Sequence, residues 1–141
     1  MVHCVLALGS NIGNKAENIK KAYTELNNFG IEIVSKSSFY NNPAYGYEDQ
    51  EDFVNSVILA KTEYCPEELL DAIKVIEKKL GRLETFRWGP RIIDIDIIFY
   101  DNIKYNSEKL FIPHKDYKNR DFVLKPLEEI KQDLKIYNII F

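Results

Sequence analysis

Cysteine and long apolar runs are both scarce in this sequence. Its two cysteines, Cys4 and Cys65, have neither the number nor the spacing of a disulfide framework or a thiolate metal site, so we expect reduced thiols in a cytoplasmic protein. No stretch approaches the roughly 20 apolar residues of a membrane-spanning helix. The N-terminal apolar run ends at Gly9 and has no basic region before it, unlike a signal peptide. We therefore predict no membrane partner.

The sequence also lacks a strong excess of either charge. Its formal net charge is −3 over 141 residues, whereas proteins that bind nucleic acid through a broad surface carry a strongly basic face. Repeats, low-complexity tracts and linker-like stretches are absent as well. The length suits one domain with its own core. We therefore expect a single domain over residues 1–141, no nucleic-acid partner, and a monomer.

A glycine-rich phosphate loop is the third absence. Gly9 and Gly13 follow an apolar run, but the stretch lacks the Gly-Lys-Ser/Thr of a P-loop and the third glycine of a dinucleotide fingerprint. The pattern favours an ordinary turn from a strand to a helix. Any phosphate chemistry must therefore depend on other residues.

Hydrophobic periodicity predicts an α+β fold. The predicted strands are residues 2–8, 31–40, 53–62 and 91–100, and the predicted helices lie between Asn14 and Gly30 and between Pro66 and Gly81. The order strand, helix, strand, strand, helix, strand is that of a ferredoxin-like βαββαβ core, a mainly antiparallel sheet with two helices packed on one face. Later in the chain, the patterns predict short strands at 103–105 and 134–141 and a helix at 123–130.

One stretch combines arginines with paired carboxylates. Arg82, Arg87 and Arg91 precede Asp94 and Asp96, and the arginine side chain suits phosphate because its planar fork donates two hydrogen bonds at once. Residues at i and i+2 of a strand share a face, so the two aspartates repel each other unless a cation lies between them. A solvent-facing strand edge is the plain alternative. Mg²⁺ prefers such hard oxygen ligands and shares them with phosphates, so the stretch predicts metal-assisted chemistry on a polyphosphate.

Three further polar residues have both an ordinary and a functional interpretation. Asn55 shares a predicted strand face with apolar residues, and its amide could bond to a nearby loop or to a ligand. Glu77 lies near the end of the second helix, where a solvated carboxylate is the ordinary expectation. His114 precedes a segment rich in lysine and arginine and could donate to phosphate or be structural.

The motifs occur in an order that resembles one enzyme family. They are Leu8-Gly9-Ser10-Asn11, Asp52-Phe53-Val54-Asn55, Gly81-Arg82, Arg87-Trp88-Gly89-Pro90-Arg91 with Asp94-Ile95-Asp96-Ile97, Pro113-His114 and Lys118-Asn119-Arg120. The chain resembles the 6-hydroxymethyl-7,8-dihydropterin pyrophosphokinases of folate biosynthesis over nearly its whole length. The Arg-Trp-Gly-Pro-Arg segment followed by Asp-x-Asp is the most specific part of the match.

The resemblance implies an enzyme that transfers pyrophosphate from ATP to the pterin hydroxymethyl oxygen and releases AMP, with two Mg²⁺ ions as cofactors. The implied metal ligands are Asp94 and Asp96, which form the catalytic set together with Arg82 and Arg91. The implied ATP-binding residues are Glu77, Arg82, Arg87, Trp88, Arg91, Ile97, His114 and Arg120. The implied pterin-binding residues are Asn42, Pro43, Tyr45, Phe53, Asn55, Trp88 and Phe122.

Two departures from the family pattern and two alternative functions stay open. Glu84 stands where the family often has an arginine, and a carboxylate there is expected to repel phosphate. Phe53 replaces a common tyrosine, which keeps ring stacking but loses a hydroxyl group.

The alternatives are a ferredoxin-like RNA-binding module, which needs exposed aromatic residues and a basic surface, and a different two-carboxylate phosphotransferase or nucleotidyltransferase. The reaction products distinguish the latter.

Overall fold

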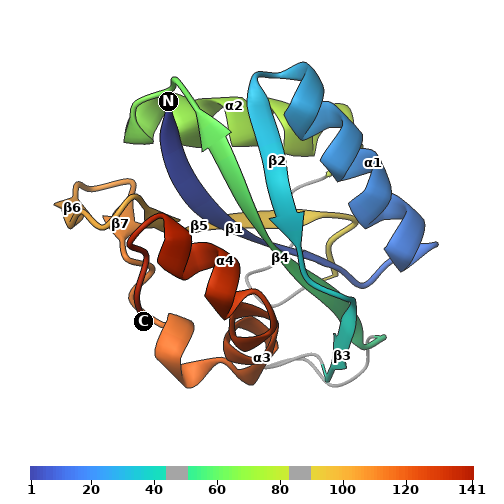
Figure 1. The fold of residues 1–141 in the computed structure, drawn as a ribbon. Helices are drawn as coiled ribbons and strands as arrows, with labels where there is room; N and C mark the ends of the chain where they lie inside the picture. Colours follow the sequence, from blue (N-terminus) through green and yellow to red (C-terminus); the bar gives the residue numbers. More distant parts are fainter. Residues whose placement is uncertain (44–50, 83–89) are drawn as a thin grey trace.

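A five-stranded antiparallel sheet forms the centre of the protein (Figure 1). The computed structural model describes residues 1–43, 51–82 and 90–141. The main strands are β1 (Val2–Ser10), β2 (Ile31–Lys36), β4 (Phe53–Thr62) and β5 (Asp94–Tyr100), which lie in the order β2-β4-β1-β5. The short strand β3 (Tyr40–Asn42) continues the edge of the sheet along β4. The predicted α+β class with an antiparallel sheet is confirmed.

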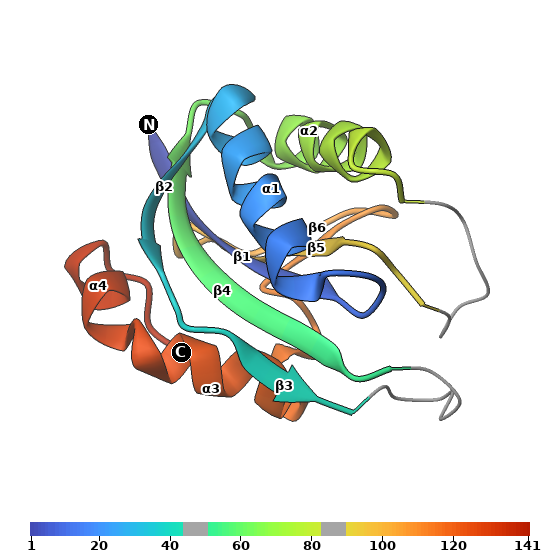
Figure 2. The ribbon, with the colours of Figure 1, turned by 90° about the vertical axis from the view of Figure 1, so that its right-hand side faces the viewer.

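Helices cover both faces of this sheet (Figure 2). On one face lie α1 (Lys15–Asn28) and α2 (Pro66–Lys79), and on the other lie α3 (Asp121–Glu129) and α4 (Lys131–Ile136). The α1 and α2 side buries Leu6 and Ile58, and the α3 and α4 side buries Val57. Strand alternation accounts for this, because neighbouring residues of a central strand point to opposite faces. Within the described ranges, no helix is both long and apolar enough to cross a membrane.

The helix boundaries follow the predicted caps. The Asn14 side chain accepts a hydrogen bond from the Glu17 N–H, at 3.2 Å, and so caps α1. Beyond the helix ends, Gly30 and Gly81 have φ angles of 83° and 98°, which glycine adopts without strain. The chain therefore turns sharply from α1 into β2 and from α2 toward the arginine-rich stretch.

Two strand predictions were wrong. Residues 134–141 do not form a strand: Leu134 lies in α4, and it continues the stripe of Val123, Leu127 and Ile130, whose spacing of three and four residues is helical. Residues 31–40 do not form one continuous strand either, since β2 ends at Lys36 and β3 begins at Tyr40. The predicted helix at 123–130 begins two residues earlier than expected, at Asp121.

Smaller elements complete the chain. The short strand expected at 103–105 lies at β6 (Tyr105–Asn106) and pairs with β7 (Phe111–Ile112). A single turn of 3-10 helix, η1 (Tyr117–Asn119), precedes α3. It brings the chain from β7 back to the start of β5, where Asp94 and Asp96 lie.

A β-bulge corrects the predicted alternation in β5. Val5 pairs with Phe99 and Leu6 pairs with Ile97, so Ile98 is an extra residue on β5. Phe99 was expected on the face of Ile95 and Ile97, but the bulge turns it toward α3 and α4. Asp94 and Asp96 come before the bulge and keep the predicted common face.

Candidate active site

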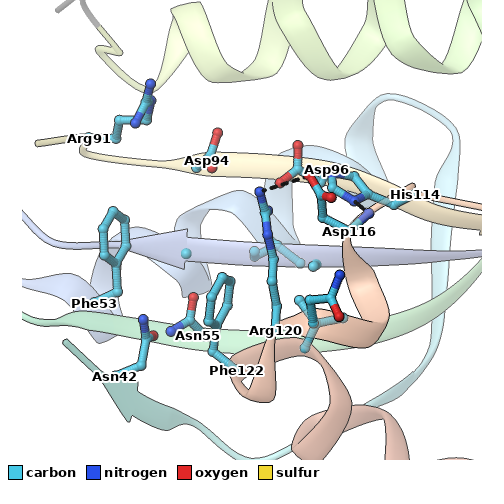
Figure 3. A pocket seen from close by; sticks show the side chains of 15 residues that line it. Asn42, Phe53, Asn55, Arg91, Asp94, Asp96, His114, Asp116, Arg120 and Phe122 are labelled. Carbon is cyan, nitrogen blue, oxygen red and sulfur yellow. Dashed lines mark hydrogen bonds and ion pairs between the residues drawn. The ribbon is translucent and has the colours of Figure 1, made fainter. Parts of the chain in front are cut away.

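A cavity of about 510 Å³ lies where β1, β4 and β5 meet the start of α3. Its wall brings together most of the residues implied for catalysis and substrate binding, which come from four separate parts of the sequence (Figure 3). The predicted residues that line it are Asn42, Phe53, Asn55, Arg91, Asp94, Asp96, His114, Arg120 and Phe122. Such a concave site with a few convergent polar groups is typical of a small-molecule binding site.

A second cavity, of about 560 Å³, lies between α2 and β5. Its lining includes three lysines, Lys74, Lys109 and Lys115, and the apolar side chains of Leu70 and Ile97. Asp96 and His114 line both cavities. Two ligands bound in the two cavities would therefore meet at this pair of residues.

The floor of the first cavity depends on Gly9. This residue pairs with Asn55 on one side and with Asp94 on the other. A Cβ atom at position 9 would lie 2.8 Å from Asn55 Oδ1 and 3.4 Å from a Phe53 ring carbon. Glycine is therefore required here for close approach of side chains, a role beyond the strand-to-helix turn that the sequence suggested.

Two buried amide atoms in this region have no hydrogen-bond partner among the described residues. They are Asn42 Oδ1, an acceptor, and Asn55 Nδ2, a donor. An unsatisfied buried polar atom costs about 1–3 kcal/mol. The arrangement therefore favours a ligand edge over a backbone partner for Asn55, and it adds Asn42 as a second contact.

Asp96 is the most electrostatically perturbed group of the site. Burial, followed by the neighbouring Asp94 carboxylate, raises the pKa of Asp96 to about 7, and Arg120 acts in the opposite direction. Among the described residues, no cluster of three or more His, Cys, Asp or Glu side chains could enclose a metal ion. Two carboxylates beside an open cavity nevertheless suit Mg²⁺, which commonly takes one or two carboxylates and completes its shell with phosphates and water.

His114 is held as a neutral donor. Its Nδ1 accepts the Asp116 N–H at 3.2 Å, so the proton of the neutral ring lies on Nε2. Burial and the Arg120 guanidinium lower the pKa of His114. Arg120 itself lies 3.8 Å from Asp116 Oδ2 and points toward Asp96 in Figure 3. Asp116 thus holds both His114 and Arg120, whose donor groups can bind a phosphate.

Glu77 is buried, and the expectation of a solvated helix residue was wrong. Only 2% of Glu77 is exposed, and its Oε2 accepts hydrogen bonds from Ile95 N–H at 2.9 Å and from Arg82 Nη1 at 2.5 Å. Arg82 Nη1 also reaches Asp94 Oδ1 at 3.0 Å. Glu77 thus fixes both the start of β5 and the Arg82 side chain, which lines neither of the two cavities.

Asn11 is a residue that the sequence reasoning did not single out. It is 1% exposed, and its side chain accepts the Arg91 N–H at 2.7 Å and donates to the Glu51 carbonyl at 3.2 Å. Its own N–H donates to the Arg91 carbonyl at 3.1 Å. The available signal was an asparagine directly after a buried strand, where a side-chain amide can replace sheet pairing.

The remaining predicted residues do not enter the described site. Pro43 is exposed and does not line the first cavity. Tyr45, Glu84, Arg87 and Trp88 lie outside the described residues.

Comparison with known proteins identifies the family of this chain. The model of one family, 7,8-dihydro-6-hydroxymethylpterin-pyrophosphokinase (HPPK), matches residues 5–132. The chain belongs to the HPPK family. A curated family member from Aquifex aeolicus is 43% identical over 134 residues, which cover 95% of this chain and 83% of that protein. A member from Haemophilus influenzae is 42% identical over 141 residues, covering 98% and 87%. Both are named 2-amino-4-hydroxy-6-hydroxymethyldihydropteridine pyrophosphokinase, and the prediction of this enzyme class is confirmed.

Other HPPK relatives are longer. A folate synthesis bifunctional protein of Arabidopsis thaliana is 42% identical over 127 residues, which are 89% of this chain but 26% of that protein. Among solved structures, Plasmodium falciparum HPPK-DHPS with SDX-DHP has a TM-score of 0.67 at 20% identity and covers 99% of this chain. This chain spans 41% of that one. The structural likeness supports the HPPK fold.

Proposed function

We propose that this chain transfers pyrophosphate from ATP to the hydroxymethyl oxygen of 6-hydroxymethyl-7,8-dihydropterin, giving the pterin diphosphate and AMP. The observation that carries the proposal is the pair of cavities that share Asp96 and His114. One cavity has aromatic and amide groups for a flat heterocycle, and the other has lysines and apolar side chains for a nucleotide. Membership of the HPPK family supports the same assignment.

The first cavity suits the pterin. Phe53 and Phe122 line it and can stack on a planar ring. A pterin edge presents both N–H donors and a carbonyl acceptor, which complement Asn42 Oδ1 and Asn55 Nδ2. A site with such buried amides discriminates strongly against ligands that cannot form these hydrogen bonds.

The second cavity suits ATP. Leu70 and Ile97 offer apolar contact for the adenine, and the three lysines balance the phosphate charge. His114 at the shared boundary, and Arg120 and Arg91 in the wall of the first cavity, can donate to the β- and γ-phosphates. Arg82, held by Glu77 beside Asp94, adds a third guanidinium near the metal ligands.

Asp94 and Asp96 would hold Mg²⁺, and the pair fits two ions if the phosphates supply the remaining ligands. When bound, Mg²⁺ neutralises phosphate charge and orients the reacting oxygens. The residues themselves place the pterin hydroxymethyl oxygen, through Asn42, Asn55 and the two phenylalanines, against the β-phosphorus. The new bond forms between this oxygen and the β-phosphorus as the bond from that phosphorus to the AMP oxygen breaks, and one of the two aspartates would accept the hydroxyl proton.

The assay is direct. Purified chain, ATP, Mg²⁺ and 6-hydroxymethyl-7,8-dihydropterin are expected to yield AMP and the pterin diphosphate in equal amounts. Chromatography of the reaction mixture measures both products. Well-folded protein that releases no AMP would contradict the proposal. ADP or free pyrophosphate as the product would instead identify a different phosphotransferase or nucleotidyltransferase.

The RNA-binding alternative is disfavoured by the layers of the fold. A ferredoxin-like RNA platform uses an open sheet face with exposed aromatic rings. In this protein, helices cover both faces of the sheet (Figure 2).

A single domain over residues 1–141 that acts as a monomer in the cytoplasm stays a prediction.

Gly9→Ala is expected to raise the KM for the pterin by about tenfold, because the added methyl group displaces Asn55 by steric contact. The KM for ATP should stay nearly unchanged, since Gly9 lines only the first of the two cavities. Steady-state kinetics with each substrate varied in turn measure both values. Equal changes in the two KM values would contradict a local effect at Asn55.

A further inference from the structure

The chain between β2 and β3 contains one residue more than the strand it faces. Lys36 pairs with Ile58 and Tyr40 pairs with Asn55, so residues 37–39 lie opposite residues 56 and 57. Ser37 bridges this irregularity. Its N–H donates to the Val57 carbonyl at 2.9 Å, and its hydroxyl accepts the Val57 N–H at 2.9 Å. The next residue, Ser38, is then the extra one, and its N–H finds no partner on β4.

A single carboxylate from α3 takes up the donors that this irregularity leaves. Glu129 accepts hydrogen bonds from the Ser38 N–H at 2.8 Å, the Ser38 hydroxyl at 2.9 Å and the Tyr40 hydroxyl at 2.7 Å. The Tyr40 hydrogen bond, and then those of Ser38, lower the pKa of Glu129. The carboxylate is therefore ionised at neutral pH, and its hydrogen bonds are charge-assisted.

This contact joins the two walls of the first cavity. Phe122 lies at the start of α3, seven residues before Glu129, and so on the same side of the helix. Asn42 lies two residues after Tyr40, on the same face of β3, and it pairs with Phe53. Figure 3 shows Asn42, Asn55 and Phe122 at one end of the cavity. A slip of one residue in β3 would turn Asn42 out of the cavity, because strand side chains alternate between faces.

We propose that Glu129 is a positioning residue for the pterin. By holding the bulge and β3 against α3, it keeps the Asn42 side chain directed into the cavity that Phe53 and Phe122 line. The inference rests on the proposed function, since it concerns the pterin end of that site. Glu129 lines neither cavity and acts through Asn42.

The test compares Glu129→Gln with Glu128→Gln. Glu128 is the adjacent exposed carboxylate, and it pairs only at 3.7 Å with Lys131 among the described contacts. Glu129→Gln keeps the side-chain size but loses the negative charge and one hydrogen-bond acceptor. We expect the pterin KM to rise about tenfold, whereas kcat and the ATP KM should change by less than about twofold. Glu128→Gln should behave as wild type.

Tyr40→Phe gives an independent measurement. We expect it to raise the pterin KM about threefold. The double variant with Glu129→Gln should raise it by less than the product of the two single effects, because both changes act on one shared set of hydrogen bonds. A pterin KM unchanged in Glu129→Gln would overturn the inference. So would a loss of kcat with equal rises in both KM values, which indicates general destabilisation. Failure of the proposed function is seen separately, as wild-type protein that forms no AMP from the pterin.

Discussion

Asp96→Asn is expected to lower kcat by about a thousandfold, since one of the two carboxylates for the metal is lost and metal-assisted charge stabilisation contributes several kcal/mol. The asparagine keeps the size of the side chain, so both substrate cavities should persist. The AMP-release assay with Mg²⁺ measures the loss. Turnover near that of the wild type would contradict the metal assignment of Asp96.

The same variant is expected to be more stable than the wild type in metal-free buffer at pH 8. Burial and Asp94 raise the pKa of Asp96 to about 7 in the folded chain, above its ordinary value of 3.8. The fold therefore favours the protonated form, and that stability is present below pH 3.8 and is lost as the pH rises through about 7. Removing the charge should gain on the order of 2 kcal/mol at pH 8.

Thermal unfolding in EDTA at pH 5 and pH 8 tests this. The difference between Asp96→Asn and wild type should be larger at pH 8, where wild-type Asp96 is ionised. Adding Mg²⁺ with an ATP analogue should stabilise the wild type more than the variant, because the ligand binds only the folded state and needs both carboxylates. A variant that is less stable than the wild type at pH 8 would show that Asp96 is not an electrostatic cost to the fold.

Glu77→Ala is expected to destabilise the chain by about 3 kcal/mol, because it leaves a buried N–H and one partner of a largely buried ion pair unsatisfied. Ile95 N–H loses its acceptor, and Arg82, whose side chain is 24% exposed, keeps only Asp94. Activity should fall as well, since Ile95 separates the two aspartates and its backbone sets their position.

Glu77→Gln separates the two contributions. Its side-chain oxygen can still accept the Ile95 N–H, so it should lose clearly less stability than Glu77→Ala. Urea unfolding monitored by circular dichroism gives both values. Equal losses in the two variants would show that the charge pairs with Arg82 and Lys74, and not the hydrogen bond to β5, account for the role of Glu77.

Local patterns in the sequence predicted the parts of this protein that depend on neighbours in the chain. Alternation and helical spacing gave the main strands and the two helices of one face, and the spacing of Asp94 and Asp96 gave their common orientation. The bulge at Ile98 could not be foreseen, because it is defined only by the partner strand β1.

The missed residues have partners far away in the sequence. Asn11 contacts Arg91, 80 residues away, and Glu129 contacts Ser38, 91 residues away. Gly9 is required because Asn55 and Phe53 lie over it, on a neighbouring strand. Each of these roles follows from tertiary packing, which a pattern within one segment of the sequence does not reveal.

The sheet also acts as a partition with a practical consequence for engineering. Its two faces carry separate apolar clusters, one beneath α1 and α2 and the other beneath α3 and α4. Asn42, Asn55, Arg120 and Phe122 belong to the α3 side, so substitutions deep in the α1 layer, around Ile19 and Leu26, can tune thermal tolerance without reaching the pterin pocket. Stability and pterin recognition can thus be designed largely independently in this chain.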